Sequence, residues 1–215
     1  MTDLYEIHIE TLANGGDGIG RINGKVCFVP YTAPGDIADI EITETKKNYS
    51  RGRVVRLRTA SEHRTEPFCP YFGECGGCTW QHLEYAAQLE AKQELLASTL
   101  AKFSGSAPRP SALHPEASNP AVPPVLPAPR TTGYRNTARF HVDRSGAIGF
   151  YRRESHQVVP IDSCPLLMPE INRRLAELIP AVREAATRPH QIHSYVSETG
   201  ELKEWMDYGG AAKDL

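Results

Sequence analysis

The chain has 215 residues, of which 40% are hydrophobic and 23% charged, with 24 Lys and Arg against 26 Asp and Glu. This composition is typical of one or two folded domains and excludes fibrous, collagen-like and wholly disordered proteins. Because the formal net charge is −2, any nucleic-acid binding has to come from local clusters of positive charge. The sequence has no apolar run of about 18 residues and no secretory signal at its start, so we expect a cytoplasmic protein without a membrane span.

Residues 1–60 have the pattern of a small β-barrel. Apolar and polar side chains alternate over 5–10 and again over 38–42, as they do in half-buried strands. The Asn-Gly pair at 23–24 predicts a two-residue hairpin. GGDGIG at 15–20 lies between strands without a strand–loop–helix context, so we predict a turn there and no nucleotide loop. Short strands with Gly-rich turns favour a five-stranded barrel of the oligonucleotide-binding type.

Residues 61–107 combine a cysteine-rich loop with a predicted helix over 83–103. The helix is expected to bury the face that carries Leu89, Leu96, Leu100 and Phe103. Eight of the seventeen prolines then fall within 108–129, which predicts an extended linker.

Residues 130–215 are expected to form a mixed α/β domain. YRNTARFHV and AIGFYRRESHQVVPI predict two strands around a turn at Asp143 to Gly146. A second amphipathic helix is predicted just after Pro169, with Pro180 kinking or splitting it. The whole chain is therefore predicted to be α+β, with a barrel followed by this domain.

The cysteines at 69, 75 and 78 lie within CPYFGECGGCTWQH, where a two-residue gap lets two thiolates face one centre. In a reducing compartment such a group indicates metal binding more readily than a disulfide framework. Three clustered cysteines with one distant fourth are typical of an iron–sulfur cluster, while zinc remains an alternative. Cys164 is the better candidate for the fourth ligand, because Cys27 lies in a predicted strand and fits a small buried hydrophobe.

Two segments carry an excess of positive charge that the near-neutral total conceals. Residues 46–64 hold seven Lys or Arg against one acid, and residues 130–153 hold six against one. Arginines interleaved with aromatic residues favour RNA, although ordinary solvated strand faces would give the same pattern. The candidate RNA contacts are Lys46, Lys47, Arg51, Arg53, Arg56 and Arg58 in the first segment, and Tyr134, Arg135, Arg139, Arg152 and Arg153 in the second.

GGDGIGRINGKVCFVPYTAPGD, the cysteine loop with its trailing Gln-His and the following helix, and GFYRRESHQVVPIDSCPLL together resemble the RNA (uracil-5-)-methyltransferases. These enzymes methylate C5 of uracil in ribosomal or transfer RNA with S-adenosylmethionine. The resemblance implies that residues 1–60 form a TRAM domain, a small RNA-binding barrel. It also implies that Cys69, Cys75, Cys78 and Cys164 hold a 4Fe-4S cluster that supports RNA binding.

Members of the family continue into a Rossmann-like domain with a glycine-rich cofactor loop, a nucleophilic cysteine and a carboxylate base. No segment of this chain matches those motifs, so no catalytic residue is assigned and S-adenosylmethionine is expected only in a domain missing here. We therefore expect the RNA-recognition part of such an enzyme, inactive alone. The alternative is a stand-alone RNA-binding module, with an iron–sulfur or zinc centre, that acts with a separate methyltransferase domain or subunit.

Overall fold

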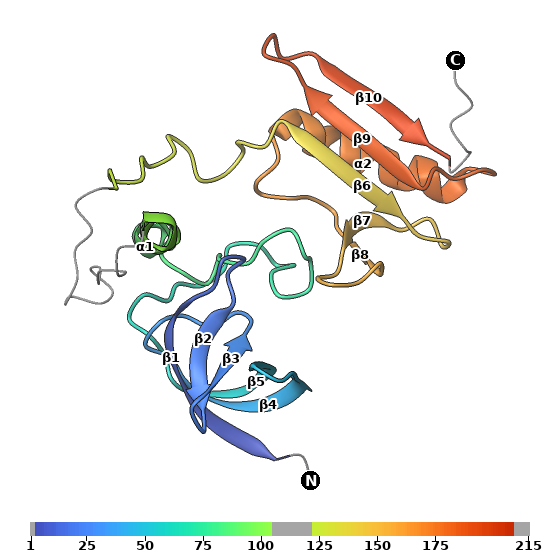
Figure 1. Ribbon diagram of the computed structural model, residues 1–215. Coiled ribbons are helices and arrows are strands. Elements are labelled where there is room, and N and C mark those ends of the chain that lie inside the picture. The colour runs from blue at the N-terminus through green and yellow to red at the C-terminus, as the bar shows by residue number, and fades with distance from the viewer. Residues whose placement is uncertain (1–2, 105–121, 209–215) are drawn as a thin grey trace. The chain divides into compact units, whose positions relative to one another are not determined.

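The computed structural model describes residues 3–104 and 122–208 (Figure 1). The chain divides into two compact units that are interleaved in sequence. The first unit comprises the residues up to Pro67 together with Thr79–Pro127, and the second comprises Phe68–Cys78 together with the residues from Ala128 onward. Residues 61–107, expected to combine the cysteine loop and a helix, are thus divided: the cysteine loop belongs to the second unit and the helix to the first. No helix in the described ranges is long and apolar enough to cross a membrane.

A closed five-stranded barrel forms the core of the first unit, as predicted. The strands follow the order β1-β2-β3-β5-β4 around the barrel, and only the β3–β5 pair is parallel. Apolar residues that alternate along the strands fill the interior, among them Ile7, Val29 and Ile40. Cys27 is buried with them, which confirms its prediction as a small hydrophobe. The strands are β1 (Leu4–Leu12), β2 (Gly18–Ile22), β3 (Lys25–Val29), β4 (Ile37–Thr45) and β5 (Tyr49–Thr59).

Glycines in the barrel allow positive φ in a turn and close contact between two strands. Asn23 and Gly24 both have positive φ, 51° and 79°, which confirms the predicted hairpin between β2 and β3. The GGDGIG segment is a turn only in its first half, because Gly18 and Gly20 lie in β2. A Cβ at Gly20 would lie 2.2 Å from the carbonyl oxygen of His8, so β1 and β2 approach each other too closely for any side chain there.

The helix α1 (Tyr85–Ser104) lies where the periodicity placed it, but the predicted buried face is wrong. Leu96 and Leu100 are 45% and 47% exposed, whereas Ala87, Ala91 and Ala101 are buried. Ala91 packs with Leu83, Leu12 and Ala33 of the same unit. Small side chains allow the helix backbone to approach its neighbours closely, so alanines form the contact in place of leucines.

The linker prediction falls mainly on residues 105–121, which lie outside the described part of the chain, and the side chain of Phe103 lies outside it as well. Residues 122–129 form neither helix nor strand. They run alongside α1, since the side chain of Gln93 accepts a hydrogen bond from the backbone N–H of Val125.

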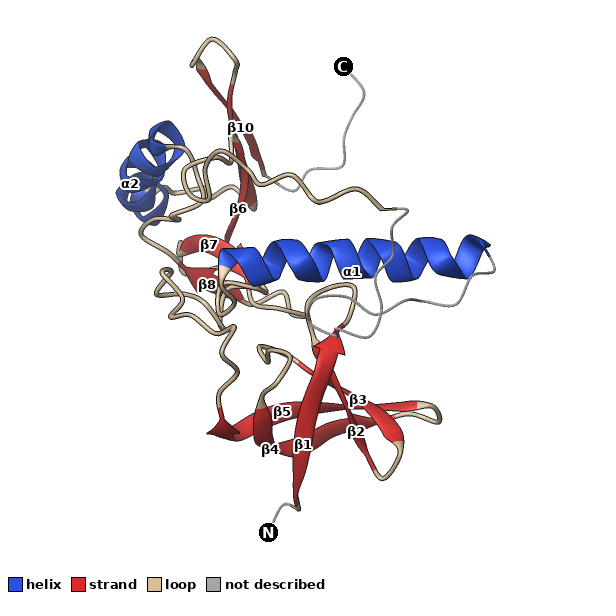
Figure 2. Ribbon diagram, turned by 90° about the vertical axis from the view of Figure 1, so that its left-hand side faces the viewer, coloured by secondary structure: helices blue, strands red, loops and turns tan. Residues whose placement is uncertain are grey.

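The second unit is a five-stranded sheet with one helix packed on one face (Figure 2). The strand order is β10-β9-β6-β7-β8, with antiparallel pairing throughout. Ile171, Leu175 and Leu178 of the helix pack on Phe140 and Ile192 of the sheet. The elements are β6 (Thr137–Val142), β7 (Ile148–Tyr151), β8 (Val158–Pro160), α2 (Pro169–Glu184), β9 (Gln191–Val196) and β10 (Leu202–Asp207).

The turn at Asp143 to Gly146 and the start of α2 at Pro169 confirm the predictions for this region. Pro180 lies inside α2 without dividing it. The strands β9 and β10 were not predicted. Arg174 on α2 donates two hydrogen bonds of 3.1 Å to Glu204 on β10, and this ion pair ties the helix to the edge strand.

Candidate cysteine site and nucleic-acid interface

The cysteine loop, Phe68–Cys78, adds to the second unit like a short extra strand. The backbone N–H of Gly76 donates to the carbonyl oxygen of Tyr151 at 2.9 Å, and Cys75 forms an isolated bridge with Arg152. A Cβ at Gly76 would lie 2.9 Å from that carbonyl oxygen and 3.0 Å from the Cα and N atoms of Arg153. Only glycine fits here without separating the loop from the backbone after β7.

Side chains fasten the cysteine loop at two further points. The hydroxyl of Tyr71 donates to Asp162 at 3.2 Å and accepts from the backbone N–H of Asp162 at 3.0 Å. Arg152 pairs with Glu74 of the loop at 3.2 Å. The loop is thus held against the segment that leads into Cys164.

Asn172 on α2 fixes the position of Cys164. Its amide oxygen accepts from the backbone N–H of Cys164 at 2.9 Å, and its amide nitrogen donates to the carbonyl oxygens of Cys164 at 2.9 Å and Leu167 at 3.4 Å. A single side chain therefore satisfies both backbone groups of the cysteine.

All four cysteines predicted as ligands belong to the second unit. Burial raises the pKa of the Cys75 thiol, and the neighbouring thiols of Cys78, Cys164 and Cys69 raise that pKa further. Burial also raises the pKa of Cys69, with a contribution from Cys164. These mutual effects mean that the four sulfur atoms lie in one region. Within the described ranges, however, no group of three or more His, Cys, Asp or Glu side chains is arranged tightly enough to hold a metal ion as it stands.

The fifth cysteine, Cys27, is separated from this region by lying inside the barrel of the first unit. Burial raises its pKa to about 11. It is therefore an uncharged thiol at neutral pH and a poor candidate for a ligand or nucleophile.

The predicted RNA contacts on the barrel lie mainly on β5, where the acids of β4 pair with them. The strand register places Arg56 opposite Asp39, Arg53 opposite Glu41 and Arg51 opposite Glu44. Arg53 forms an ion pair with Glu41, and Lys46 pairs with Glu44 at 2.6 Å. The excess charge seen in the sequence is therefore largely compensated across the strand pair.

Asp39 is the most heavily used of these acids. It accepts hydrogen bonds from Arg56 at 2.8 Å and 3.1 Å and from Arg58 at 2.7 Å. Burial alone would raise its pKa, but the bonds from the two arginines hold that pKa below its ordinary value. Replacing both arginines would leave a nearly buried carboxylate without partners, so RNA contacts are better tested at Lys47, which is exposed.

The predicted contacts of the second unit do not form one continuous group. Arg152 and Arg153 lie beside the cysteine loop, and Arg153 lies 3.8 Å from Glu154. Tyr134 is exposed, and the backbone of Arg135 bonds with Leu166 and Met168 before β6 begins. Arg139 is exposed in the middle of β6, on the sheet face opposite α2.

A buried polar network closes the barrel end near α1. Asp36 accepts bonds from Arg64 at 2.7 Å and 2.8 Å and from the backbone N–H groups of Ala33 and Ser61. His82 is 2% exposed, and its Nε2 lies 3.1 Å from the carbonyl oxygen of Thr32. Burial lowers the pKa of His82, so the imidazole is neutral at pH 7. Its position is that of a structural residue, without access to substrate.

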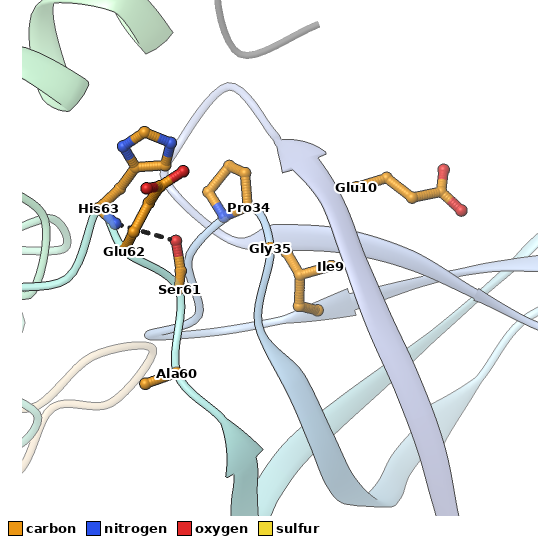
Figure 3. A pocket seen from close by; sticks show the side chains of 8 residues that line it. All are labelled: Ile9, Glu10, Pro34, Gly35, Ala60, Ser61, Glu62 and His63. Carbon is orange, nitrogen blue, oxygen red and sulfur yellow. Dashed lines mark hydrogen bonds between the residues drawn. The ribbon is translucent and has the colours of Figure 1, made fainter.

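The first unit also has an open pocket, lined by Ile9, Glu10, Pro34, Gly35, Ala60, Ser61, Glu62 and His63 (Figure 3). Ser61, Glu62 and His63 are the residue types of a hydrolytic site, but their geometry differs from one. The hydroxyl of Ser61 accepts its 3.2 Å bond from the backbone N–H of His63, as Figure 3 shows, and not from the ring. The hydroxyl therefore caps a turn, and the pocket does not supply an activated nucleophile.

Comparisons with known proteins bear on both units. Residues 3–55 match the TRAM domain family. The chain is 38% identical over 203 residues to an uncharacterized RNA methyltransferase of Gloeobacter violaceus, a match covering 92% of this chain and 41% of that protein. It is 34% identical over 182 residues to the 23S rRNA (uracil(1939)-C(5))-methyltransferase of Vibrio vulnificus, which covers 80% of this chain and 38% of the relative.

Among solved structures, the chain resembles the Pyrococcus abyssi tRNA (uracil-54, C5)-methyltransferase in complex with S-adenosyl-L-homocysteine, with a TM-score of 0.54 and 25% identity. That match covers 91% of this chain and 44% of the other. The chain thus spans about two fifths of the length of the curated relatives it matches. A TRAM domain forms the barrel, and the similarity extends over most of the chain; the protein belongs to the RNA (uracil-5-)-methyltransferase family.

Proposed function

We propose that this chain is the RNA-recognition portion of an S-adenosylmethionine-dependent RNA (uracil-5-)-methyltransferase that acts on rRNA or tRNA. The observation that carries the proposal is the TRAM match over residues 3–55, which coincides with a closed barrel in the structure. Barrels of this kind bind oligonucleotides on their strands and loops. The named relatives act on 23S rRNA and on tRNA, so both remain candidate substrates.

RNA is proposed to contact the barrel through Lys46, Lys47, Arg51, Arg53, Arg56 and Arg58. Carboxylates already neighbour most of these groups, so a phosphate that binds an arginine would replace an acid as its partner. Arginine forks are suited to either anion, because both offer paired oxygen acceptors. Lys47 is exposed and offers its charge without such an exchange. On the second unit, the proposed contacts are Tyr134, Arg135, Arg139, Arg152 and Arg153.

Cys69, Cys75, Cys78 and Cys164 are proposed to hold a 4Fe-4S cluster. Four thiols of one unit fit such a group, as does a loop whose glycine permits close backbone approach. When bound, the cluster would supply a covalent link between the cysteine loop and the Cys164 segment. Tyr71 of the loop already bonds to Asp162 next to the Cys164 segment, and Asn172 fixes Cys164 itself, which supports a bracing role for the cluster.

Methyl transfer would then depend on residues in a further domain or in a separate subunit, where S-adenosylmethionine would bind. Incubation of this chain with labelled S-adenosylmethionine and rRNA or tRNA is expected to transfer no label. Transfer by the chain alone would contradict this part of the proposal.

RNA binding is tested with the full chain by filter binding against a 23S rRNA fragment and a tRNA, at several salt concentrations. Lys47→Ala is expected to weaken binding and to reduce the slope of log K against log salt by about 0.7–0.9 if it removes one phosphate contact. Lys102→Ala, which removes an exposed charge at the end of α1, is the matched control and should bind as the wild type does. An unchanged slope for Lys47→Ala would remove that residue from the interface.

The metal is tested by measuring iron, labile sulfide and zinc in anaerobically purified protein. Iron and sulfide near four equivalents each are expected, and Cys164→Ser should lower both sharply. Cys27→Ser is the control, because that thiol lies in the barrel core and should leave the iron content unchanged. About one equivalent of zinc without sulfide would replace the cluster proposal with a zinc site.

A further inference from the structure

The sheet of the second unit has two faces of different chemistry. Ala138, Phe140, Ile192 and Val196 point to the side covered by α2 and are buried. Strand side chains alternate between faces, so the residues between them point to the opposite side. That second face, the open face, carries the side chains of Arg139 and His141 on β6, His193 and Tyr195 on β9, and Lys203 and Trp205 on β10.

Trp205, His193 and Arg139 form one row across the open face. The strand register pairs Trp205 with His193 and His193 with Arg139. The rings of Trp205 and His193 are stacked, with centroids 4.6 Å apart and planes 12° apart. Trp205 is nevertheless 54% exposed. Two aromatic rings are thus held by the sheet with much of the larger one open to solvent, and an exposed guanidinium stands at the end of the row.

A second stack lies beside this row. The rings of His141 and Tyr151 are 3.6 Å apart and nearly parallel, at 18°, and His156 meets Tyr151 edge-on at 5.3 Å. The Nδ1 atom of His141 is buried and has no hydrogen-bond partner among the described residues. It is a polar group without a ligand, next to stacked rings.

The open face carries two fixed cations, Arg139 and Lys203, and one acid, Asp207. Burial lowers the pKa of His141, and Arg139, His193 and His156 lower it further, so these positive or ionisable groups lie near one another. Asp207 at the end of β10 is an acid on the same face, in register with Gln191 and His141, and Lys203 lies 3.6 Å from Glu201. The centre of the face, around Arg139 and Trp205, therefore suits an anionic partner with flat rings.

We propose that the open face binds unpaired bases of single-stranded RNA, with Trp205 as the stacking surface and Arg139 as the contact to the adjoining phosphate or base. This inference rests on the proposed RNA-binding function: it adds a base-stacking surface around Trp205 to Arg139, which is already proposed as an RNA contact. Unpaired bases stack on aromatic side chains of sheets, whereas a duplex hides its base faces. A protein partner is disfavoured, because the face offers few aliphatic side chains for an apolar interface core.

The test uses the full chain, purified anaerobically, and a fluorescein-labelled 12-nucleotide oligouridine followed by fluorescence anisotropy. Loss of one base stack is expected to weaken binding about 5- to 150-fold in Trp205→Ala. Trp205→Phe keeps an aromatic ring and should restore most of the affinity. Arg139→Ala should lower the salt slope by about 0.7. Arg173→Ala removes an exposed arginine from α2, on the covered side of the sheet, and should bind as the wild type does.

Each outcome decides the proposal. If the wild type binds oligouridine and Trp205→Ala binds equally well, the open face is not the site, while the proposed function stands. Equal binding of a duplex of the same length would also overturn the inference. If the wild type binds no RNA of any kind, both the inference and the proposed function fail. Circular dichroism and iron content of each variant show whether the fold is intact. Trp205→Phe keeps an aromatic ring, so its affinity tests base stacking even if Trp205→Ala fails to fold.

Discussion

Replacing Gly76 with alanine tests how the cysteine loop joins the second unit. The added Cβ would lie 2.9 Å from the carbonyl oxygen of Tyr151 and 3.0 Å from two backbone atoms of Arg153. Ordinary contacts of a Cβ begin near 3.4 Å. All three obstructing atoms belong to the backbone, so none can rotate away as a side chain would. The loop and the chain after β7 must move apart.

The expected cost follows from the contacts that this movement breaks. The 2.9 Å bond between the Gly76 N–H and the Tyr151 carbonyl would lengthen, and a lost hydrogen bond costs about 1 kcal/mol. Overpacking against fixed atoms adds about 1–3 kcal/mol. We therefore expect Gly76→Ala to lower the free energy of unfolding of the second unit by about 2–4 kcal/mol. For a unit of this size, each kcal/mol lowers Tm by roughly 4–8 °C.

The assay is urea unfolding followed by circular dichroism, with iron per chain measured on the same samples. Gly77→Ala is the matched control: a Cβ there would lie 3.5 Å from the Sγ atom of Cys75, which is an ordinary contact. Its unfolding free energy should fall much less. Equal stability of Gly76→Ala and the wild type, or a larger loss in Gly77→Ala, would refute the steric reasoning.

Three further predictions concern buried polar groups. Because the folded-state pKa of His82 is lowered, the unfolded chain binds the proton more readily than the folded chain. The free energy of unfolding should therefore fall as pH drops below about 6.5, by at most about 1.4 kcal/mol per pH unit. His82→Gln, compared with the wild type by urea unfolding at pH 7.5 and 5.5, should remove the pH dependence that this histidine causes. Arg64→Ala leaves the buried Asp36 carboxylate without its arginine partner. The free energy of unfolding should fall by about 3–5 kcal/mol in the same assay, and a change below 1 kcal/mol would contradict this. Asn172→Ala removes the three hydrogen bonds between this side chain and the Cys164 segment and should lower iron per chain while leaving the barrel folded by proton NMR, and wild-type iron content would argue against the bracing role.

The barrel could be predicted from the sequence because its strands bury one face. Ile7 and Ile9 alternate with polar residues, and Asn23-Gly24 marks the hairpin by its need for positive φ. Three of the cysteines could be grouped by spacing and Cys164 could be added because Cys27 fits a buried strand, and the structure places all four in one unit. The face of α1 could not be predicted, because leucine periodicity does not tell which side approaches another element closely, and here Ala91 does so.

Other features depend on pairings that the sequence does not show. β9 and β10 were missed because aromatic residues on the open face interrupt the alternation: Trp205 and Met206 are adjacent, yet they point to opposite sides. The compensation of β5 arginines by β4 acids depends on a register that shifts three times, including between Asp39 and Ile40. Counting charges along the chain therefore overestimated the positive potential of the barrel surface.

The interleaved units have a consequence for biosynthesis. The ribosome makes the cysteine loop before α1, but the rest of its own unit begins only at Ala128. Cys164 follows roughly 90 residues after the loop, which at about 5–20 residues per second is a delay on the order of 5–20 s. The barrel can fold during that interval, while the three thiols of the loop wait without their partner strand. A nascent chain thus passes through a stage in which the first unit can be complete while the three thiols of the cysteine loop are still without the rest of their own unit and are open to oxidation.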